Sequence, residues 1–437
     1  MTAQYEARPA ACVAGELTVP GDKSISHRAL MLAGIADGRS EIGGFLAGED
    51  CLATLGAMRS LGVSIERPES DRVFVDGVGL RGLSAPAAAL DMGNAGTAIR
   101  LFTGLLCAQA FDSTLVGDAS LMKRPMERVA QPLRAMGADV RTSGGTPPVR
   151  IGGGRRLRGI EHRLPVASAQ VKSALLLAGL YAEGATTVTS PAVSRDHSER
   201  MLRGFGAAIE VDGLRVRVEP VARLEARRLE VPGDFSSAAF FIVAGLIAAD
   251  ASGLLIRNVG VNPSRTGLLT ILRAMGGEIE VSNAREQASE PVADLRVHRS
   301  ELRGIEVPKA WVPLAIDELP VLFVAAACAR GETVVTGAEE LRVKESDRIA
   351  AMSAGLRAIG VEHTALPDGM RIAGAADTPW HGGVVDSHGD HRVAMSFAVA
   401  SLRARGPIVI RDVANVATSF PGFVDRARAV GIDVRES

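Results

Sequence analysis

The sequence has few cysteines, and they are not spaced like a disulfide framework or a metal site. Only four occur in 437 residues, and no C-x-x-C pair is present. Cys107 and Cys328 lie in apolar runs, where cysteine behaves as a small buried hydrophobe. This pattern fits the reducing environment of the cytosol, so we expect a cytoplasmic protein.

The sequence also lacks a net charge and a long apolar run. Lys and Arg number 49 against 50 Asp and Glu, which argues against binding nucleic acid or an anionic membrane through bulk charge. The longest apolar runs, residues 240–249 and 321–329, are too short to cross a bilayer. The first residues show no charged-then-apolar leader. We therefore expect a soluble, unprocessed protein with no nucleic-acid and no membrane partner.

The common nucleotide and metal motifs are missing too. The residue before Lys23 is Asp22, so there is no G-x-x-x-x-G-K-[ST] loop, and no G-x-G-x-x-G opens a helix. The eight histidines form no H-E-x-x-H. His388, Asp390 and His391 fit a cation-rich anion pocket better than a metal triad. We expect neither a cofactor nor a metal ion.

What the chain does contain is a repeat. A polar turn recurs about every 70 residues, followed by an Ala/Leu-rich helical stretch, a Gly-containing turn and a β-branched run. The six openings are V-P-G-D-K-S at Val19, D-M-G-N-A-G at Asp91, L-P-V-A-S-A-Q at Leu164, V-P-G-D-F-S-S at Val231, L-A-I-D-E-L-P at Leu314 and D-S-H-G-D-H-R at Asp386. Because each unit mixes helices with strands, the pattern predicts an α/β fold in which helices cover sheets.

The near-copy of V-P-G-D falls near the middle of a chain that is too long for one core. We therefore predict two similar domains with three units each. Residues 22–233 form one, and residues 1–21 together with 234–437 form the other, which is discontinuous. Such a layout predicts an interdomain cleft, where ligands commonly bind.

Cations gather at the first of these turns. Lys23 and Arg28 flank a predicted helix start whose N-cap is expected to be Ser24, and a helix N-terminus beside Lys and Arg is an anion site. Ordinary solvated charge is the simpler alternative. However, the fourth unit keeps the turn as V-P-G-D-F-S-S and omits the cations, which favours a site at the first.

Other repeat units also contain local clusters of cationic side chains. Two further clusters space their cations four apart, as on a helix face: Lys344 with Glu345 and Arg348, and His388 with Arg392. A third, Lys123 with Arg124, precedes a proline and is expected at the end of an extended segment. The helix starts at residues 94–97 and 168–170 add small and amide residues that suit phosphate or hydroxyl groups. Singly, each cluster fits a surface salt bridge. Four in a neutral chain indicate substrates with several negative groups.

Six motifs in order resemble the 5-enolpyruvylshikimate-3-phosphate (EPSP) synthase family. They are G-D-K-S-I-S-H-R-A-L, G-N-A-G-T-A-I-R-L, G-D-A-S-L-M-K-R-P-M, S-A-Q-V-K-S-A-L-L-L-A, R-V-K-E-S-D-R and D-H-R-V-A-M-S-F. The resemblance spans nearly the whole chain. It implies the enolpyruvyl transferase fold of six βαβαββ units, a monomer, and transfer of the enolpyruvyl group of phosphoenolpyruvate (PEP) to the 5-hydroxyl of shikimate 3-phosphate, with release of phosphate.

The resemblance also implies which residues bind the two substrates. The contacts for shikimate 3-phosphate are Lys23, Ser24, Arg28, Ser168, Ala169, Gln170, Arg195, Asp317 and Lys344. The contacts for PEP are Lys23, Gly96, Arg124, Gln170, Arg348 and Arg392. Guanidinium groups suit the phosphate and carboxylate of PEP because they bind both in a bidentate manner.

The reaction includes two proton transfers, which need catalytic groups in addition to Lys23. The resemblance implies that Asp317 is the base toward the 5-hydroxyl and Glu345 the acid that protonates the methylene carbon of PEP. The plainer alternatives are a helix cap for Asp317 and a salt-bridge partner for Glu345. The neighbouring Lys344 and Arg348 should lower the pKa of Glu345, and we expect bound PEP to offset them.

One departure from the family pattern lies near the C-terminus. Many members have Lys-Thr-Phe-Pro, whereas this chain has A-T-S-F-P with Thr418 at the place of the lysine. S-A-Q-V-K and L-M-K-R-P-M are similar to the second subgroup, in which that lysine is commonly absent. The resemblance further implies that glyphosate occupies the PEP subsite.

Two other functions are alternatives to this one. The sister transferase acting on UDP-N-acetylglucosamine carries a reactive cysteine where this chain has Gly117, Asp118, Ala119 and Ser120. A non-catalytic anion-binding protein is the second alternative, and the presence of both Asp317 and Glu345 counts against it.

Overall fold

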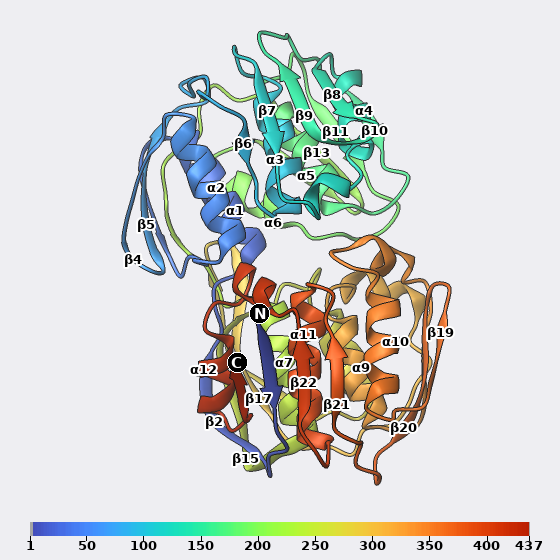
Figure 1. Ribbon diagram of the computed structural model, residues 1–437. Coiled ribbons are helices and arrows are strands. Elements are labelled where there is room, and N and C mark those ends of the chain that lie inside the picture. The colour runs from blue at the N-terminus through green and yellow to red at the C-terminus, as the bar shows by residue number, and fades with distance from the viewer. Residues whose placement is uncertain (1–2, 437) are drawn as a thin grey trace. The chain divides into compact units, whose positions relative to one another are not determined.

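The computed structural model describes residues 3–436 and divides them into two compact units (Figure 1). The N-terminal unit comprises Gly21–Val231 and Gln287–Glu290. The C-terminal unit comprises the remaining segments, up to Pro20, Pro232–Glu286 and from Pro291 onward. Each unit contains three small sheets and the helices between them.

The three sheets of the N-terminal unit share one strand pattern. In each, one parallel pair is extended by two antiparallel strands. In spatial order the strands are β14 (Arg228–Glu230), β3 (Asp37–Gly43), β5 (Arg72–Val78) and β4 (Ser64–Glu69); then β6 (Leu90–Asp91), β7 (Ser113–Val116), β9 (Thr146–Gly152) and β8 (Asp139–Ser143); then β10 (Glu161–Arg163), β11 (Thr186–Thr189), β13 (Arg215–Val218) and β12 (Ile209–Asp212). The shared pattern is the structural form of the sequence repeat.

The C-terminal unit repeats this pattern. Its sheets are β16 (Ile279–Gln287), β17 (Glu290–Val297), β15 (Ala249–Gly260) and β2 (Val13–Thr18); β18 (Arg330–Val335), β20 (Gly369–Ala375) and β19 (His363–Leu366); and β21 (Gly383–Asp386), β22 (Ile408–Arg411), β1 (Gln4–Ala7) and β23 (Val434–Glu436). The middle sheet has three strands, and isolated parallel bridges at Arg330 and Val334 stand where the others have a fourth.

The N-terminal residues complete the last repeat of the chain. Strand β1 lies between β22 and β23 and is antiparallel to both, while β2 pairs in parallel with β15. In Figure 1 the blue strand that starts at the N label lies beside the red strand β22. Residues from both ends of the sequence therefore form one sheet.

Helices connect and cover the sheets. In the N-terminal unit they are α1 (Lys23–Gly34), α2 (Glu49–Ser60), α3 (Gly96–Leu106), the 3-10 helix η1 (Leu121–Lys123), α4 (Glu127–Ala135), α5 (Ala169–Gly179) and α6 (His197–Gly204). In the C-terminal unit they are α7 (Phe235–Ala248), α8 (Gly267–Ala274), η2 (Lys309–Leu314), α9 (Leu319–Ala327), η3 (Glu339–Val343), α10 (Arg348–Ala358), α11 (His391–Ala400), η4 (Ser401–Arg403), η5 (Ala414–Thr418) and α12 (Phe423–Ala429).

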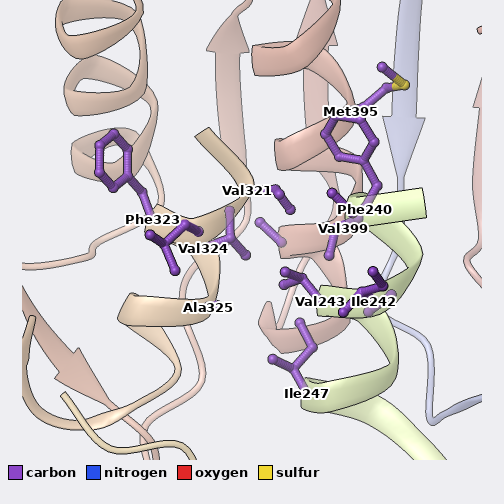
Figure 2. Packing of buried hydrophobic residues seen from close by; sticks show 14 of the residues in the cluster. Phe240, Ile242, Val243, Ile247, Val321, Phe323, Val324, Ala325, Met395 and Val399 are labelled. Atoms are coloured by element: carbon purple, nitrogen blue, oxygen red, sulfur yellow. The ribbon is translucent and has the colours of Figure 1, made fainter. Parts of the chain in front are cut away.

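Three helices form the centre of the C-terminal unit. Every residue of α7, α9 and α11 is buried, and the three helices contact one another. Figure 2 shows side chains from all three meeting, among them Val243 and Ile247 of α7, Val321 and Val324 of α9, and Val399 of α11. Because each of these helices is buried on every side, all three lie at the centre of their unit.

The architecture confirms the predicted α/β fold of six related units. Largely buried helices of both units follow the polar turns found in the sequence, as α1 follows the V-P-G-D that ends at Asp22 and α7 follows the V-P-G-D that ends at Asp234. Among residues 3–436, no helix is long and apolar enough to span a membrane.

Candidate active site

The first helix of the N-terminal unit begins with a buried cap and a salt bridge. Asp22 is the N-cap of α1, and its Oδ1 accepts from the backbone N–H of Ile25 at 2.9 Å. The prediction that Ser24 caps this helix is wrong, because Asp22 has the extended backbone of a cap and Ser24 lies within the helix. Lys23 Nζ lies 2.7 Å from Asp50 Oδ2 of α2. A carboxylate that the sequence analysis did not single out therefore orients Lys23.

Arg28 lies deeper along the same helix and joins three helices. Its guanidinium donates to Ser198 Oγ of α6 at 2.7 Å, to Ser173 Oγ of α5 at 2.8 Å and to the carbonyl oxygen of Ser24 at 2.9 Å. Burial lowers the pKa of Arg28 to about 10, partly offset by the nearby carboxylate of Glu199. The side chain stays protonated at neutral pH and contributes a fixed positive charge.

The surroundings of Arg28 contain further charge. Arg195 is close enough that its positive charge adds to the lowering of the pKa of Arg28. Lys172 of α5 and Glu199 of α6 form a buried ion pair at 2.5 Å. This pair was not predicted from the sequence, because its two residues are 27 positions apart and meet only where α5 and α6 pack together.

The start of α5 supplies neutral donors. Ser168 is the N-cap, and its Oγ accepts from the backbone N–H of Val171 at 3.4 Å. Ala169 is the first helical residue, as expected for a site that uses backbone N–H groups. Gln170 follows, and its side chain turns toward α3, where Nε2 donates to Thr97 Oγ1 at 3.0 Å.

A second arginine cluster lies at the start of α3. Arg124 Nη2 donates to Asn94 Oδ1 at 2.5 Å, and Arg100 Nη1 donates to Gln170 Oε1 at 2.7 Å and to the carbonyl oxygen of Gly96 at 2.9 Å. The two guanidinium groups flank Gly96, since a β-carbon there would lie 2.8 Å from Arg124 Nη1 and 3.0 Å from Arg100 Nη1. Arg100 was missed, although its spacing of four from Gly96 on a helix could have revealed it.

The segment that carries Arg124 differs from its prediction. Lys123 lies at the end of η1 rather than in an extended segment and is exposed, whereas Arg124 has extended backbone before Pro125. The structure therefore brings Arg124 into the α3 cluster and leaves Lys123 at the surface.

In the C-terminal unit, Arg348 holds three carboxylates together. Its Nε lies 2.8 Å from Asp390 Oδ2, its Nη1 lies 3.2 Å from Asp317 Oδ1, and its Nη2 lies 2.6 Å from Glu345 Oε2. Burial alone would lower the pKa of Arg348, but the charges of Asp390, Glu345 and Asp317 outweigh it and raise the pKa. Asp317 and Glu345 therefore both form an ion pair with the same guanidinium group.

Asp317 contacts two more cations. Lys344 Nζ lies 3.8 Å from Asp317 Oδ1 and 3.1 Å from Glu340 Oε1. Arg392 Nη2 lies 4.0 Å from Asp317 Oδ2, and its Nη1 donates to the backbone carbonyl oxygen of Asp317 at 3.1 Å. Three cations therefore surround this one carboxylate.

Helix boundaries correct three details of this region. The N-cap of α9 is Glu318, so Asp317 is not the cap that the plainer alternative assumed. Helix α10 begins at Arg348, so Lys344 does not share a helix face with it. Helix α11 begins at His391, which leaves the exposed His388 outside it.

The match to known proteins covers almost the whole chain. The family model described as EPSP synthase (3-phosphoshikimate 1-carboxyvinyltransferase) matches residues 7–427. The chain belongs to the EPSP synthase family.

Individual relatives agree with this assignment. The 3-phosphoshikimate 1-carboxyvinyltransferase of Methylococcus capsulatus is 58% identical over 99% of this chain and 98% of that relative. The protein of the same name from Legionella pneumophila is 54% identical over 99% of both. The solved EPSP synthase of Acinetobacter baumannii has 51% identity and a TM-score of 0.90 over 100% of both chains. These relatives favour the EPSP synthase assignment over the sister transferase and the non-catalytic alternative.

The departure from the family pattern at the C-terminus has a local structural counterpart. Thr418 is the last residue of η5 and is buried, and its Oγ1 donates to the carbonyl oxygen of Asn415 at 2.7 Å. Asn415 Nδ2 in turn donates to the carbonyl oxygen of Gly389 at 2.7 Å, just before α11. The position that carries lysine in many members therefore stabilises a turn in this chain.

No group of three or more His, Cys, Asp or Glu side chains that could hold a metal ion occurs within residues 3–436. The carboxylates of the candidate site are bound instead by Arg348, Arg392 and the two lysines Lys23 and Lys344.

Proposed function

We propose that this chain is a 3-phosphoshikimate 1-carboxyvinyltransferase. It transfers the enolpyruvyl group of PEP to the 5-hydroxyl of shikimate 3-phosphate and releases phosphate. The observation that carries the proposal is Asp317, a carboxylate within 4.0 Å of Lys344, Arg348 and Arg392 in a chain whose family match is nearly full length. Such a group can accept a proton while the cations bind anionic substrates.

The proposed subsite for shikimate 3-phosphate uses the starts of α1 and α5. Ser168, Ala169 and Gln170 offer a helix N-terminus, and Lys23 and Arg28 lie at and within α1. Helix N-termini and cations both favour a phosphate. Arg195, Asp317 and Lys344 complete the proposed set.

The proposed PEP subsite uses guanidinium groups. Arg124 lies beside Gly96 at the start of α3, where a glycine leaves room for a ligand to approach the backbone. Arg348 and Arg392 lie against Asp317 in the C-terminal unit. Bidentate contacts to phosphate and carboxylate would orient PEP, and Lys23 and Gln170 would add a charge and an amide.

The chemistry then needs two proton transfers. Asp317 takes the proton of the 5-hydroxyl while the oxygen of that hydroxyl forms a bond to C2 of PEP. Glu345 gives a proton to the methylene carbon of PEP. In the elimination that follows, the deprotonated Glu345 takes a proton back from the new methyl group, the double bond re-forms, and the C–O bond to phosphate breaks, which releases phosphate. Arg348 contacts both carboxylates and so holds the base and the acid at one place.

Purified protein should release phosphate only when shikimate 3-phosphate and PEP are both supplied, without an added metal or cofactor. A colorimetric phosphate assay measures this directly. Activity abolished by a chelator, or activity with UDP-N-acetylglucosamine in place of shikimate 3-phosphate, would overturn the proposal. We also propose that the protein works as a monomer in the cytoplasm, and light scattering on the purified protein tests its mass.

A further inference from the structure

Five buried side chains link the starts of the three central helices of the C-terminal unit. They are Asp234 and Ser236 at the start of α7, Glu318 before α9, Arg392 in the first turn of α11, and Arg265 just before α8. Their exposed fractions are 9% or less. We call these five residues the helix-start relay.

Hydrogen bonds run from Arg265 to Glu318. Arg265 Nη2 donates to Asp234 Oδ1 at 3.1 Å and to Ser236 Oγ at 2.8 Å. Ser236 Oγ donates its own proton to Glu318 Oε1, which lies 3.9 Å from Arg392 Nη1 on its other side. The relay therefore fixes the carboxylate of Glu318 beside the guanidinium of Arg392.

The side chain of Glu318 does not cap its own helix. Glu318 is the N-cap residue of α9, yet its side chain makes no cap hydrogen bond. A buried carboxylate is costly unless it is hydrogen-bonded and paired. The hydroxyl of Ser236 and the guanidinium of Arg392 meet that need. The central apolar helices in Figure 2 hold these groups in place, since α7, α9 and α11 pack against one another.

We propose that Glu318 is a positioning residue that fixes the guanidinium of Arg392 for PEP, with Ser236 and Arg265 holding Glu318. The inference rests on the proposed function. Arg392 Nη1 is held between the backbone carbonyl oxygen of Asp317 at 3.1 Å and Glu318 Oε1 at 3.9 Å. A free arginine samples many rotamers, and holding it in one beforehand lowers the entropy lost when PEP binds.

This role also explains the fourth V-P-G-D turn, which lacks the cations of the first. There Asp234 caps α7 and also binds Arg265, which lies about 30 residues later in the sequence. The turn therefore holds a carboxylate and a hydroxyl for the relay and needs no lysine of its own.

The test is steady-state kinetics of Glu318→Gln in the full chain, with each substrate varied in turn. The change keeps the side-chain size and removes the charge. We expect the KM for PEP to rise about tenfold, as for loss of one charge-assisted contact, while the KM for shikimate 3-phosphate stays within about twofold. In an Arg392→Lys background the same change should have little further effect on the KM for PEP, because the group it positions is gone.

Asp294→Asn is the matched control. Asp294 is a buried carboxylate of the same unit that accepts from the backbone N–H of Asn258 at 2.8 Å and from Asn283 Nδ2 at 2.9 Å, outside the relay. It should lower the melting temperature and leave the KM for PEP unchanged. If Glu318→Gln does not fold, Ser236→Ala cuts the relay with a smaller change and should raise the KM for PEP in the same selective way.

An unchanged KM for PEP in both relay variants would overturn the inference, as would equal changes for both substrates or full additivity with Arg392→Lys. These outcomes differ from failure of the proposed function. If the proposed function were wrong, the wild-type protein itself would not release phosphate from PEP and shikimate 3-phosphate.

Discussion

The two units share one architecture but differ at the starts of two of their three central helices. The first helices are alike, since α1 begins after Asp22 and α7 after Asp234. In the N-terminal unit, however, α3 and α5 begin after Ala95 and Ser168, which carry no charge, whereas α9 and α11 of the C-terminal unit begin after the acidic Glu318 and Asp390. Because a helix N-terminus attracts negative charge, the starts of α3 and α5 leave that attraction available to a ligand, while those of α9 and α11 lie beside the protein's own carboxylates.

The proposed function uses this difference. In the N-terminal unit, the start of α3 offers the backbone of Gly96 beside Arg124, and the start of α5 offers the backbone N–H groups that follow Ser168. In the C-terminal unit, Arg348 holds a network of carboxylates that includes Asp317, the proposed base, and Glu345, the proposed acid. We propose that proton transfer depends on the C-terminal unit, whereas both units bind the anionic groups of the substrates.

Asp317→Asn should have the largest effect, because it removes the proposed base from the C-terminal network. We expect turnover to fall by a factor of about 10² to 10⁴ while shikimate 3-phosphate still binds. Steady-state assays and isothermal calorimetry measure the two quantities. Asp347→Asn is the control: Asp347 caps the neighbouring α10, and asparagine caps equally well. Normal turnover in Asp317→Asn would place the base elsewhere.

Arg124→Ala tests whether the N-terminal unit binds the anionic groups of PEP. Loss of a charged bidentate contact should raise the KM for PEP by about 10-fold to 100-fold. The KM for shikimate 3-phosphate should change much less. The exposed Arg128 on α4 offers the matched control, and Arg128→Ala should behave as wild type. A rise of equal size in both KM values would show that Arg124 supports the fold rather than PEP binding.

Gly96→Ala should have a smaller effect at the same helix start. The added β-carbon would lie 2.8 Å from Arg124 Nη1, so the guanidinium must shift. We expect the KM for PEP to rise several-fold, up to about tenfold, and inhibition by glyphosate to weaken more than that. Inhibition measured at several PEP concentrations in wild type and Gly96→Ala decides this. A wild-type protein that is insensitive at low PEP would show that Gly96 does not control the pocket.

The smallest expected effect concerns stability in acid. His27 of α1 is fully buried, and burial, with the charges of Lys23 and Arg28, lowers its pKa to about 3. The unfolded chain binds a proton near pH 6.5 and the native protein does not, so stability falls as pH decreases below that value.

Between pH 6.5 and 5.5 this group alone should lower the free energy of unfolding by about 1 kcal/mol. Urea denaturation of wild type and His27→Gln at both pH values measures the difference. The pair should show no such difference between pH 7.5 and 8.5, where His27 is neutral in both states. An identical pH dependence in the two proteins at low pH would contradict the assignment.

The sequence by itself determined the repeat, the α/β class and the cations at the helix starts. These features are local: neighbouring residues specify a turn, a cap and a helical period, as in the V-P-G-D that directly precedes α1. The family motifs added the substrates. Even local signals failed at the detailed level, since Asp22 rather than Ser24 caps α1.

Only the tertiary structure decided the partners of those cations. Asp50 binds Lys23 from 27 residues away, Asp390 binds Arg348 from 42 away, and Arg265 reaches Ser236 from 29 away. The physical reason is that each buried polar group must find a partner where the helices of different repeats pack together. The packing of α7, α9 and α11 decides which helix starts come together, and no short stretch of the sequence specifies that packing.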